Sequence, residues 1–440
     1  MLRSKDQNMN KLKIIKTNCA YEREPLIKPF GFKGGYMNEI WQTVAGIRCK
    51  SGRGTIGIGT QSVLWSDASV FSSHSEAEGN DLMFQITRFA LERGRETEWE
   101  NPVELQDQIF DDVYGYAKKI TANPDLRMTF VLNALVAVDN AAWILYAKEN
   151  GFQDFDAMVP EEYRKSLSFR HEKLACVPLM SYGVSTGDIE IAARDGFFFL
   201  KVKIGSDPAG DGDPDKMLDW DMKRIREVHK AVSTIETSHT KNGKIPYYFD
   251  ANGRYDSKER LLKLLEYAKK MGIFERIAIL EEPFPEEYEA DVSDLEVRIA
   301  ADESAHSAQD AEKRIQMGYQ AIALKPIAKT LSMSLKIADV CNRRRIPCFC
   351  ADLTVNPILV DWNKNMAARL PPLPKMDVGV LETNGHQNYK RWDIMKKFHP
   401  CFEAGWTQVH DGLFDLDNDF YLRSGGIFEE SKHYADLLKE

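Results

Sequence analysis

The chain has 440 residues, of which 43% are hydrophobic and 28% are charged, and its formal net charge is −9 at pH 7. These are ordinary globular values, and the length predicts about two or three domains, or fewer if one of them is a large α/β barrel. The acidic balance argues against a nucleic-acid-binding protein, because such proteins concentrate positive charge.

The cysteines and the apolar runs bear on where the protein works. There are seven cysteines, an odd number without the spacing of a small disulfide-bonded domain. We therefore expect reduced thiols and a cytoplasmic protein. The sequence shows neither a signal-peptide pattern nor an uninterrupted apolar run of about 18 residues, so we expect no membrane span.

The first third of the chain is typical of an α+β domain. Strand-like stretches at 12–16, 41–50 and 55–59 predict an antiparallel meander. The stretch 29–36 is rich in glycine and aromatic residues, which predicts a mobile loop. From about residue 80 the pattern becomes helical, and 130–148 predicts a long, mostly buried helix.

After Pro178 the pattern alternates between strands and helices. The predicted strands are 177–182, 197–205, 245–250, 277–282, 297–302, 321–325, 346–352 and 377–382. The predicted helices are 217–233, 257–271, 307–317, 331–343 and 361–370. This rhythm predicts a (β/α)-barrel of seven or eight units. The alternative, a doubly wound open sheet, would need a glycine-rich phosphate-binding turn after the strand at 177–182, where none is found.

The strand predicted at 197–205 carries two lysines, Lys201 and Lys203. Side chains alternate along a strand, so both ammonium groups share one face. Like charge and partial burial would lower the pKa of each lysine, which suits a base that works near neutral pH. The alternative is an edge strand protected by lysines, but the flanking aromatic and aliphatic residues argue against an edge.

Charged residues also end the following predicted strands. Asp250, Glu281 and Asp302 end three consecutive strands, and Lys325 ends the next one. Barrel enzymes place their chemistry at this end of the strands. Converging carboxylates need a cation, and hard oxygen ligands select Mg²⁺ or Mn²⁺ over zinc. Such an ion could bind a substrate carboxylate and stabilise the enediolate that forms when the α-proton leaves.

Each of these residues also has a simpler explanation when it is taken alone. Asp250 could cap the next helix, and Lys325 could be a solvated loop residue. Glu282 competes with Glu281 for the inward position, as Glu303 does with Asp302. The functional interpretation rests on the five features falling on consecutive strands at the same end.

These residues resemble the enolase superfamily, and within it the muconate lactonizing enzyme-like subgroup of the mandelate racemase family. Sites of this superfamily use a lysine or histidine base with Mg²⁺. The resemblance implies an α+β capping domain over 1–150, a (β/α) barrel over 175–398, and a segment 400–440 that returns to the cap. It also implies the metal ligands Asp250, Glu281 and Asp302, the acid/base lysines Lys203 and Lys325, and Lys201 as the charge that tunes Lys203.

Departures from the family pattern bear on the reaction. The helix around 140–148 resembles the family's A-L-W-D-L-x-G-K helix, with Ile144 and Ala147 in place of Asp and Gly. The seventh strand lacks the histidine of the mandelate racemase subgroup, which argues against an acid-sugar dehydratase. The eighth strand lacks the D-x-D of dipeptide epimerases, whereas Glu382 resembles the glutamate of cycloisomerases. Lys325 followed by proline is similar to o-succinylbenzoate synthases.

We therefore expect a Mg²⁺-dependent racemase or epimerase that acts on a small-molecule carboxylate. The alternatives are a cycloisomerase or syn-dehydratase on the same site, and a non-catalytic barrel that only binds a ligand. Segments 30–36 and 61–67 of the cap are expected to close over the barrel mouth. We also expect a homo-oligomer with neither a nucleic-acid nor a membrane partner. The expected substrate contacts are Asn252, Glu382, Asp352, Trp65 and Phe32.

Overall fold

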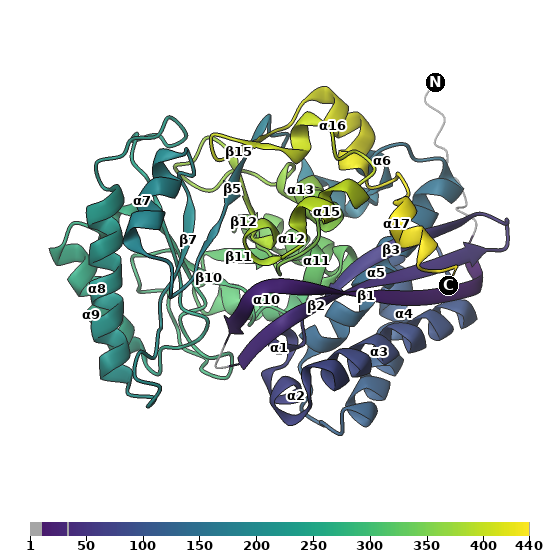
Figure 1. The fold of residues 1–440 in the computed structure, drawn as a ribbon, viewed down its shortest axis with the longest axis horizontal. Helices are drawn as coiled ribbons and strands as arrows, with labels where there is room; N and C mark the ends of the chain where they lie inside the picture. Colours follow the sequence, from purple (N-terminus) through teal and green to yellow (C-terminus); the bar gives the residue numbers. More distant parts are fainter. Residues whose placement is uncertain (1–10, 33–34, 440) are drawn as a thin grey trace.

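The N-terminal sheet is built around one long hairpin. The computed structural model describes residues 11–32 and 35–439 (Figure 1). Its first sheet has the strand order β3-β2-β1-β4. The strands are β1 (Leu12–Phe32), β2 (Gly35–Cys49), β3 (Gly54–Gln61) and β4 (Glu98–Trp99). The predicted meander is therefore present, but its first two strands are longer than the sequence indicated.

The stretch 29–36, predicted as a mobile loop, belongs in part to this hairpin. Phe30 pairs with Met37 across the two strands, and only positions 33–34 fall outside the described residues. The register of the ladder shifts between Pro25 and Phe30. A proline cannot donate to a ladder, and an irregular stretch tolerates it. The prolines and glycines therefore produce a shift in register rather than a loop.

Helices cover one face of the first sheet, and the apolar one among them lies against β3. The helices of the cap are α1 (Val63–Ser66), α2 (Ala68–Ser73), α3 (Glu76–Glu96), α4 (Pro102–Ile120) and α5 (Met128–Asn150). A side-chain carbon at Gly57 of β3 would come within 2.2 Å of the backbone oxygen of Ala137. Helix and sheet therefore touch backbone to backbone at this point.

Helix α5 is the one helix in the described part of the chain that is long and apolar enough to cross a membrane. Its most apolar window is 94% buried inside the protein. Every residue from Thr129 to Ala147 is buried. We conclude that α5 is a core helix.

The second sheet curls into a barrel. Its strand order is β14-β15-β5-β13-β12-β11-β10-β9-β8-β7-β6. The strands are β5 (Lys173–Val177), β6 (Leu179–Met180), β7 (Leu200–Lys203), β8 (Tyr247–Asp250), β9 (Ile277–Glu281), β10 (Ile299–Ala301), β11 (Ala321–Leu324), β12 (Cys348–Cys350), β13 (Gly379–Glu382), β14 (Val409–His410) and β15 (Leu413–Asp415). All neighbours from β6 round to β5 are parallel.

The barrel closes at its first strand. β5 pairs with β13 and β6 pairs with β7, and only Pro178 separates β5 from β6. The first and eighth predicted strands are therefore neighbours, which an open doubly wound sheet would not allow. The predicted fold class, a capped TIM-type barrel, is confirmed.

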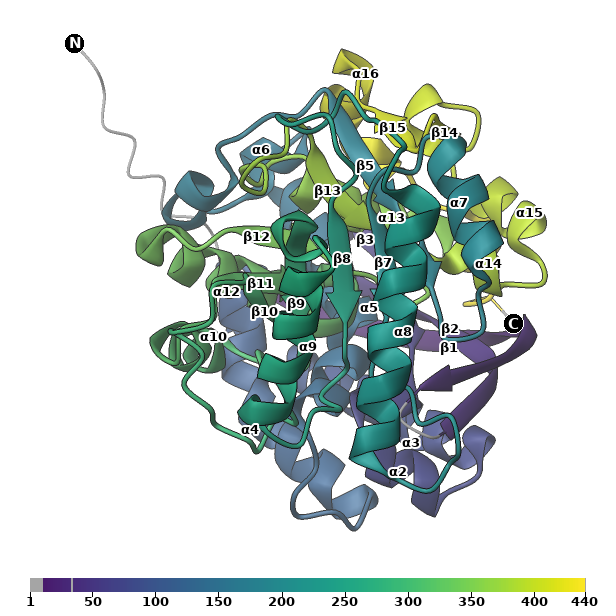
Figure 2. The same cartoon turned by 90° about the vertical axis from the view of Figure 1, so that its left-hand side faces the viewer.

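Helices α7, α8 and α9 lie outside the strands that they follow (Figure 2). The helices that follow the barrel strands are α7 (Thr186–Arg194), α8 (Pro214–Val232), α9 (Lys258–Lys270), α10 (Ala308–Gln316), α11 (Pro326–Lys329), α12 (Leu331–Arg344), α13 (Pro357–Ala367), α14 (Gly385–Asn388) and α15 (Trp392–Met395). The five helices expected from the sequence are all present, within a few residues of their predicted ends.

The last 40 residues contact both parts of the protein. β15 extends the barrel sheet beside β5, and α16 (Asn418–Arg423) follows it. α17 (Lys432–Asp436) lies beside β1 of the cap (Figure 1). There the side-chain amide of Asn18 donates to the backbone oxygen of Leu438 at 2.9 Å.

Hydrogen bonds also join the cap sheet to the loops at the barrel mouth. The Asn356 amide donates to Oε1 of Gln42 on β2 at 2.9 Å. Gln42 donates to the Tyr389 hydroxyl at 2.9 Å, and that hydroxyl donates to the Thr354 backbone oxygen at 2.6 Å. β2 is thereby tied to the loop that follows β12.

Candidate active site

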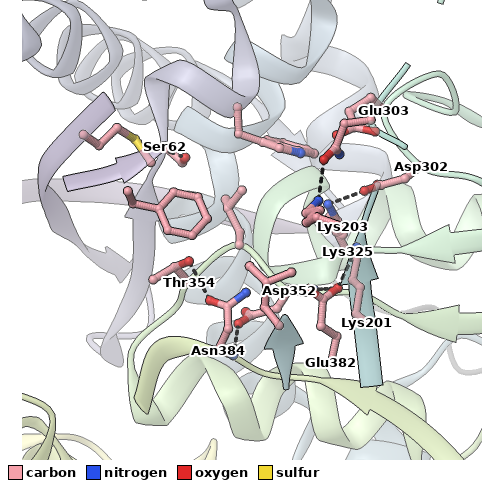
Figure 3. A pocket seen from close by; sticks show the side chains of 16 residues that line it. Ser62, Lys201, Lys203, Asp302, Glu303, Lys325, Asp352, Thr354, Glu382 and Asn384 are labelled. Atoms are coloured by element: carbon pink, nitrogen blue, oxygen red, sulfur yellow. Dashed lines mark hydrogen bonds and ion pairs between the residues drawn. The ribbon is translucent and has the colours of Figure 1, made fainter. Parts of the chain in front are cut away.

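A cavity of about 50 Å³ lies between the cap and the carboxyl ends of the barrel strands (Figure 3). Eight residues that the sequence singled out line it: Lys201, Lys203, Asn252, Asp302, Lys325, Asp352, Glu382 and Trp65. The other lining residues are Phe30, Met37, Ser62, Leu179, Glu303, Leu353, Thr354 and Asn384. The side chain of Phe32 lies outside the described residues.

Strand β7 places both lysines of the K-x-K pair on this cavity. β7 has a hydrogen-bonded neighbour on each side, so it is not an edge strand. The Lys201 ammonium lies 2.9 Å from Oε1 of Glu281, 3.0 Å from Oδ2 of Asp250 and 3.1 Å from Oε2 of Glu382. Lys201 therefore joins strands β8, β9 and β13 from the centre of the barrel.

The electrostatics of Lys201 differ from the prediction. Burial lowers the pKa of Lys201, but the charges of Asp250, Glu281 and Glu382 outweigh it and hold this pKa well above its ordinary value. The expectation that the lysine pair lowers its own pKa values is therefore wrong for Lys201. The sequence showed the neighbouring lysine but not the three carboxylates from distant strands.

Lys203 lies nearer the cavity than Lys201. Its side chain is 12% exposed, against 3% for Lys201. The Lys203 ammonium contacts Oδ2 of Asp250 and Oδ1 of Asn252. Asn252 follows β8 in a left-handed conformation, with φ of 45°, which asparagine tolerates better than most residues. The turn after β8 thus brings an amide oxygen to this lysine.

Lys325 approaches from the end of β11. Its ammonium forms an ion pair with Oδ2 of Asp302 and lies 4.5 Å from the centre of the Trp65 ring. Burial lowers the pKa of Lys325, but Asp302 and then Glu303 raise it by more, so the net shift is upward. Lys329, one turn further on in α11, is fully buried and donates to the backbone oxygen of Ala305 at 3.0 Å.

Carboxylates from β9 and from the turn after β10 form a cluster. One oxygen each of Glu281, Asp302 and Glu303 lies within 4.8 Å of the others. Burial, and then the charge of Asp250, raise the pKa of Glu281 well above its ordinary value. Oε2 of Glu303 is buried without a hydrogen-bond partner. A buried group of carboxylate oxygens with this excess of negative charge fits Mg²⁺ or Mn²⁺.

This cluster contains Glu303, which the sequence treated as a competitor of Asp302 rather than as a companion. Strand β10 ends at Ala301, and the chain turns at 302–304. Strict alternation of side chains therefore no longer applies, and both carboxylates line the cavity. Asp250, the third predicted ligand, instead directs Oδ2 to Lys201 and Lys203.

The adjacent glutamates Glu281 and Glu282 have different roles. Glu281 ends β9 and faces Lys201. Glu282 has a left-handed backbone, with φ of 40°, and its Oε2 accepts hydrogen bonds from the backbone amides of Asp302, at 2.6 Å, and Ser304, at 3.3 Å. Glu282 therefore fixes the turn that presents Asp302 and Glu303.

The ends of β12 and β13 form the opposite wall. Oδ2 of Asp352 accepts from the backbone amide of Asn384 at 2.7 Å, whereas its Oδ1 is buried without a hydrogen-bond partner. Burial, and then the charge of Glu382, raise the pKa of Asp352 to about 7. The Thr354 hydroxyl donates to Oδ1 of Asn384 at 2.6 Å. Sequence reasoning missed Thr354 and Asn384, although each lies two residues beyond a predicted contact.

The cap contributes Trp65 from α1 to the cavity. Trp65 is 6% exposed, and its indole N–H is buried without a hydrogen-bond partner. It covers Lys325 through the ring contact described above. Phe30 and Met37 from the β1–β2 hairpin line the same side. The expectation that the cap covers the barrel mouth is therefore supported at Trp65 and Phe30.

Comparison with known proteins bears on the fold of this chain. No curated protein sequence matches the chain. Residues 188–399 match the family model described as "Enolase C-terminal domain-like". Among solved structures, an enolase superfamily member of unknown function from Enterococcus faecalis V583 is similar, with 18% identity and a TM-score of 0.63, over 98% of each chain.

Two epimerase structures are also similar. The dipeptide epimerase from Enterococcus faecalis V583, in complex with Mg and the dipeptide L-Leu-L-Tyr, has 17% identity and a TM-score of 0.59, over 87% of this chain and 92% of that one. The L-Ala-D/L-Glu epimerase from Bacillus subtilis has 17% identity and a TM-score of 0.57, over 86% and 91%. At these identities the likeness concerns the fold.

The fold and the site together define a capped barrel with acidic and lysine residues at its mouth. Residues 188–399 match the enolase C-terminal domain-like family model, and the fold of the chain is similar to that of solved enolase superfamily members.

Proposed function

We propose that this protein is a divalent-metal-dependent racemase or epimerase that moves the α-proton of a small carboxylate substrate. One observation carries the proposal. Lys203 from β7 and Lys325 from the end of β11 line a single cavity that also holds the carboxylates of Asp302 and Glu303. Two opposed bases are what inversion at a carbon requires, since one removes the proton and the other returns it on the other face.

The surrounding residues prepare the two lysines for these roles. Asp250 and Asn252 hold Lys203, and Asp302 and Trp65 hold Lys325. The lysine that accepts the proton must be neutral, whereas the other must be charged. Lys201 stays charged among its three carboxylates and acts as a positioning residue.

The proposed metal ligands are Asp250, Glu281 and Asp302, with Glu303 beside them. When bound, a divalent cation supplies positive charge at the substrate carboxylate, which stabilises the charge that develops as the α-proton leaves. The same cation would offset the negative charge that now holds the pKa of Lys325 high. The names of the epimerase structures support this proposal. The buried free cysteines fit a cytoplasmic enzyme.

Loss of either lysine should abolish proton transfer. We expect Lys203→Ala and Lys325→Ala each to lower α-proton exchange by about 10²- to 10⁴-fold, the usual contribution of general acid–base catalysis. The measurement is deuterium incorporation in heavy water, screened over N-acyl amino acids, dipeptides, proline betaines and sugar acids. The exposed Lys216→Ala is the matched control. Exchange that survives the loss of Lys203 would contradict the proposal.

Metal binding should stabilise the folded protein. At free Mg²⁺ of about 100 times its Kd we expect a gain of about 2.7 kcal/mol in unfolding free energy. Calorimetric melting with Mg²⁺ and with EDTA measures it. The gain should disappear in Glu281→Gln and persist in Glu282→Gln, because only Glu281 belongs to the cluster. An equal Tm with and without Mg²⁺ would favour a non-catalytic binding protein.

A second candidate is a syn-elimination or cycloisomerisation on the same site. It is favoured by the upward shift of the Lys325 pKa, because a lysine that stays charged stabilises anionic intermediates without exchanging protons. Product analysis separates the two candidates. Retained mass with inverted configuration indicates epimerisation, whereas loss of water indicates elimination.

A further inference from the structure

A second cavity, of about 210 Å³, lies on the other side of the β13–α14 connection from the active site. Its walls are largely apolar and come from α13, α15 and the segment 396–414. The apolar lining residues are Pro357, Val360, Trp392, Phe402, Val409 and Phe414. Phe402 is 39% exposed and Val409 36%, so the cavity reaches the surface at these residues.

Three buried ionisable residues form the floor of this cavity. The Lys364 ammonium lies 2.6 Å from Oδ1 of Asp361, and the His399 imidazole lies 2.8 Å from Oδ2 of the same carboxylate. None of the three is more than 3% exposed. Nδ1 of His399 accepts from the backbone amide of Cys401 at 2.9 Å, so the Nε2 that faces Asp361 carries the proton.

The floor has hydrogen-bond donors to spare. Oδ1 of Asp361 accepts from Lys364, whereas Nε2 of His399 is buried without a hydrogen-bond partner although it lies 2.8 Å from Oδ2 of Asp361. An ammonium group has three N–H bonds, and Lys364 has two oxygen partners, Asp361 and the backbone oxygen of Trp406 at 2.8 Å. A second lysine, Lys396, lines the cavity at the surface. The two lysines and one aspartate give the lining a formal charge of +1.

We propose that this cavity binds a small monocarboxylate with an apolar, ring-sized body, at a site separate from the active site. The apolar walls accommodate the body, and the Lys364 end accommodates the carboxylate. An engineered cavity of about 150 Å³ already admits benzene. The larger volume here therefore has room for one ring and its carboxylate. His386, which is exposed, adds an imidazole to the wall.

The site adjoins the reaction centre without sharing its groups. Thr383 lines the second cavity, whereas its chain neighbours Glu382 and Asn384 line the active-site cavity. One extended segment therefore forms the partition between the two. A ligand in the second cavity would contact the back of the segment that carries Glu382, the partner of Lys201.

The test is ligand-observed ¹⁹F NMR of the full chain in EDTA, with 4-fluorobenzoate as the probe and 4-fluorobenzamide as its uncharged counterpart. We expect saturable binding of the benzoate. The amide should bind about tenfold or more weakly, because it lacks the charge-assisted hydrogen bond of the carboxylate. Lys364→Met should remove this preference. Because Lys364 is buried and its loss could unfold the protein, Lys396→Met provides a second charge variant at the exposed mouth.

A bulky substitution at the mouth of the second cavity provides a test that does not depend on charge. Val409→Trp should weaken benzoate binding by about tenfold or more by filling the opening. Ile394→Trp adds the same bulk at an exposed position that does not line the cavity, and should leave binding unchanged. Lys325→Ala should also leave it unchanged. Equal binding of the amide, unchanged binding in Val409→Trp, or lost binding in Lys325→Ala would each overturn the proposal.

Discussion

The two walls of the active-site cavity carry similar residues in opposite electrostatic states. On the wall from β7 to β11, Lys201, Lys203 and Lys325 pair with Asp250 and Asp302. On the wall from β12 and β13, the acidic residue at the cavity surface keeps an oxygen without a hydrogen-bond partner. On the first wall the lysines hold Asp250 and Asp302 ionised, whereas the second wall favours a protonated Asp352.

The pKa shifts of Asp250 on the first wall and Asp352 on the second have opposite signs. Burial raises the pKa of Asp250, but the charges of Lys201 and Lys203 lower it by more, so its pKa falls to about 2. Burial and Glu382 instead raise the pKa of Asp352 to about 7. Paired charges suit the proton-transfer step, which is the same for every substrate. An unpaired acceptor is available to the part of the substrate that varies. We therefore propose that the first wall carries the chemistry and that Asp352 on the second contributes to selectivity.

Removing Lys201 should produce the largest change in stability. Lys201→Met leaves the buried carboxylates of Asp250, Glu281 and Glu382 without their shared cation. We expect a loss of about 3–5 kcal/mol in the free energy of unfolding of the metal-free protein. Urea denaturation at pH 7 measures it. The surface pair of Lys336 and Asp107 is the control, since Lys336→Met should cost at most about 1 kcal/mol.

The same wall determines how acid affects the fold. A carboxyl whose pKa is lowered on folding stabilises the protein above its unfolded pKa, near 4, and this stabilisation is lost as the pH falls toward 2. The acid-induced loss of stability should therefore be shallower in Lys201→Met than in the natural protein. If stability fell equally steeply with acid in both proteins, this would contradict the pairing of Asp250 with Lys201.

Asp352 should show the reverse dependence. Its pKa is raised on folding, so the unfolded chain releases this proton at lower pH than the folded protein does, and stability falls as the pH rises from about 4 to about 7. Asp352→Asn should remove this fall. Urea midpoints at pH 4.5 and 7 for both proteins, taken in EDTA, measure the difference. Parallel pH profiles for the two proteins would show that Asp352 does not titrate in this range.

Trp65→Ala should produce the smallest and most selective change. Trp65 contacts Lys325 through its ring, and its indole N–H is buried without a hydrogen-bond partner. We expect ratios of kcat/KM between substrates to shift by about tenfold, with a much smaller change in Mg²⁺ affinity. Equal losses in both would contradict a role of Trp65 in substrate selection. Phe30→Ala, in the hairpin, is the companion variant.

Sequence patterns predicted most of the barrel because each unit repeats the same local chemistry. Lys203, Asp250 and Glu281 end their strands, and neighbouring parallel strands end together. The glycine- and aromatic-rich stretch 29–36 indicated a mobile loop, whereas in the structure the long hairpin continues there after a shift in register between Pro25 and Phe30. Glu303 joined the cluster because a turn, not a strand, follows Ala301. The raised pKa of Lys201 depends on three carboxylates from other strands, which no local pattern contains.

The bond between Asn356 and Gln42 has a consequence for how such a protein can diversify. Gln42 belongs to the cap, and Asn356 follows the loop that carries Asp352 and Thr354. If the cap alone were exchanged between related proteins, the wall from β12 and β13 would lose this hydrogen bond to the cap. Inherited changes in specificity are therefore expected to arise in both domains together, while the lysine wall stays constant.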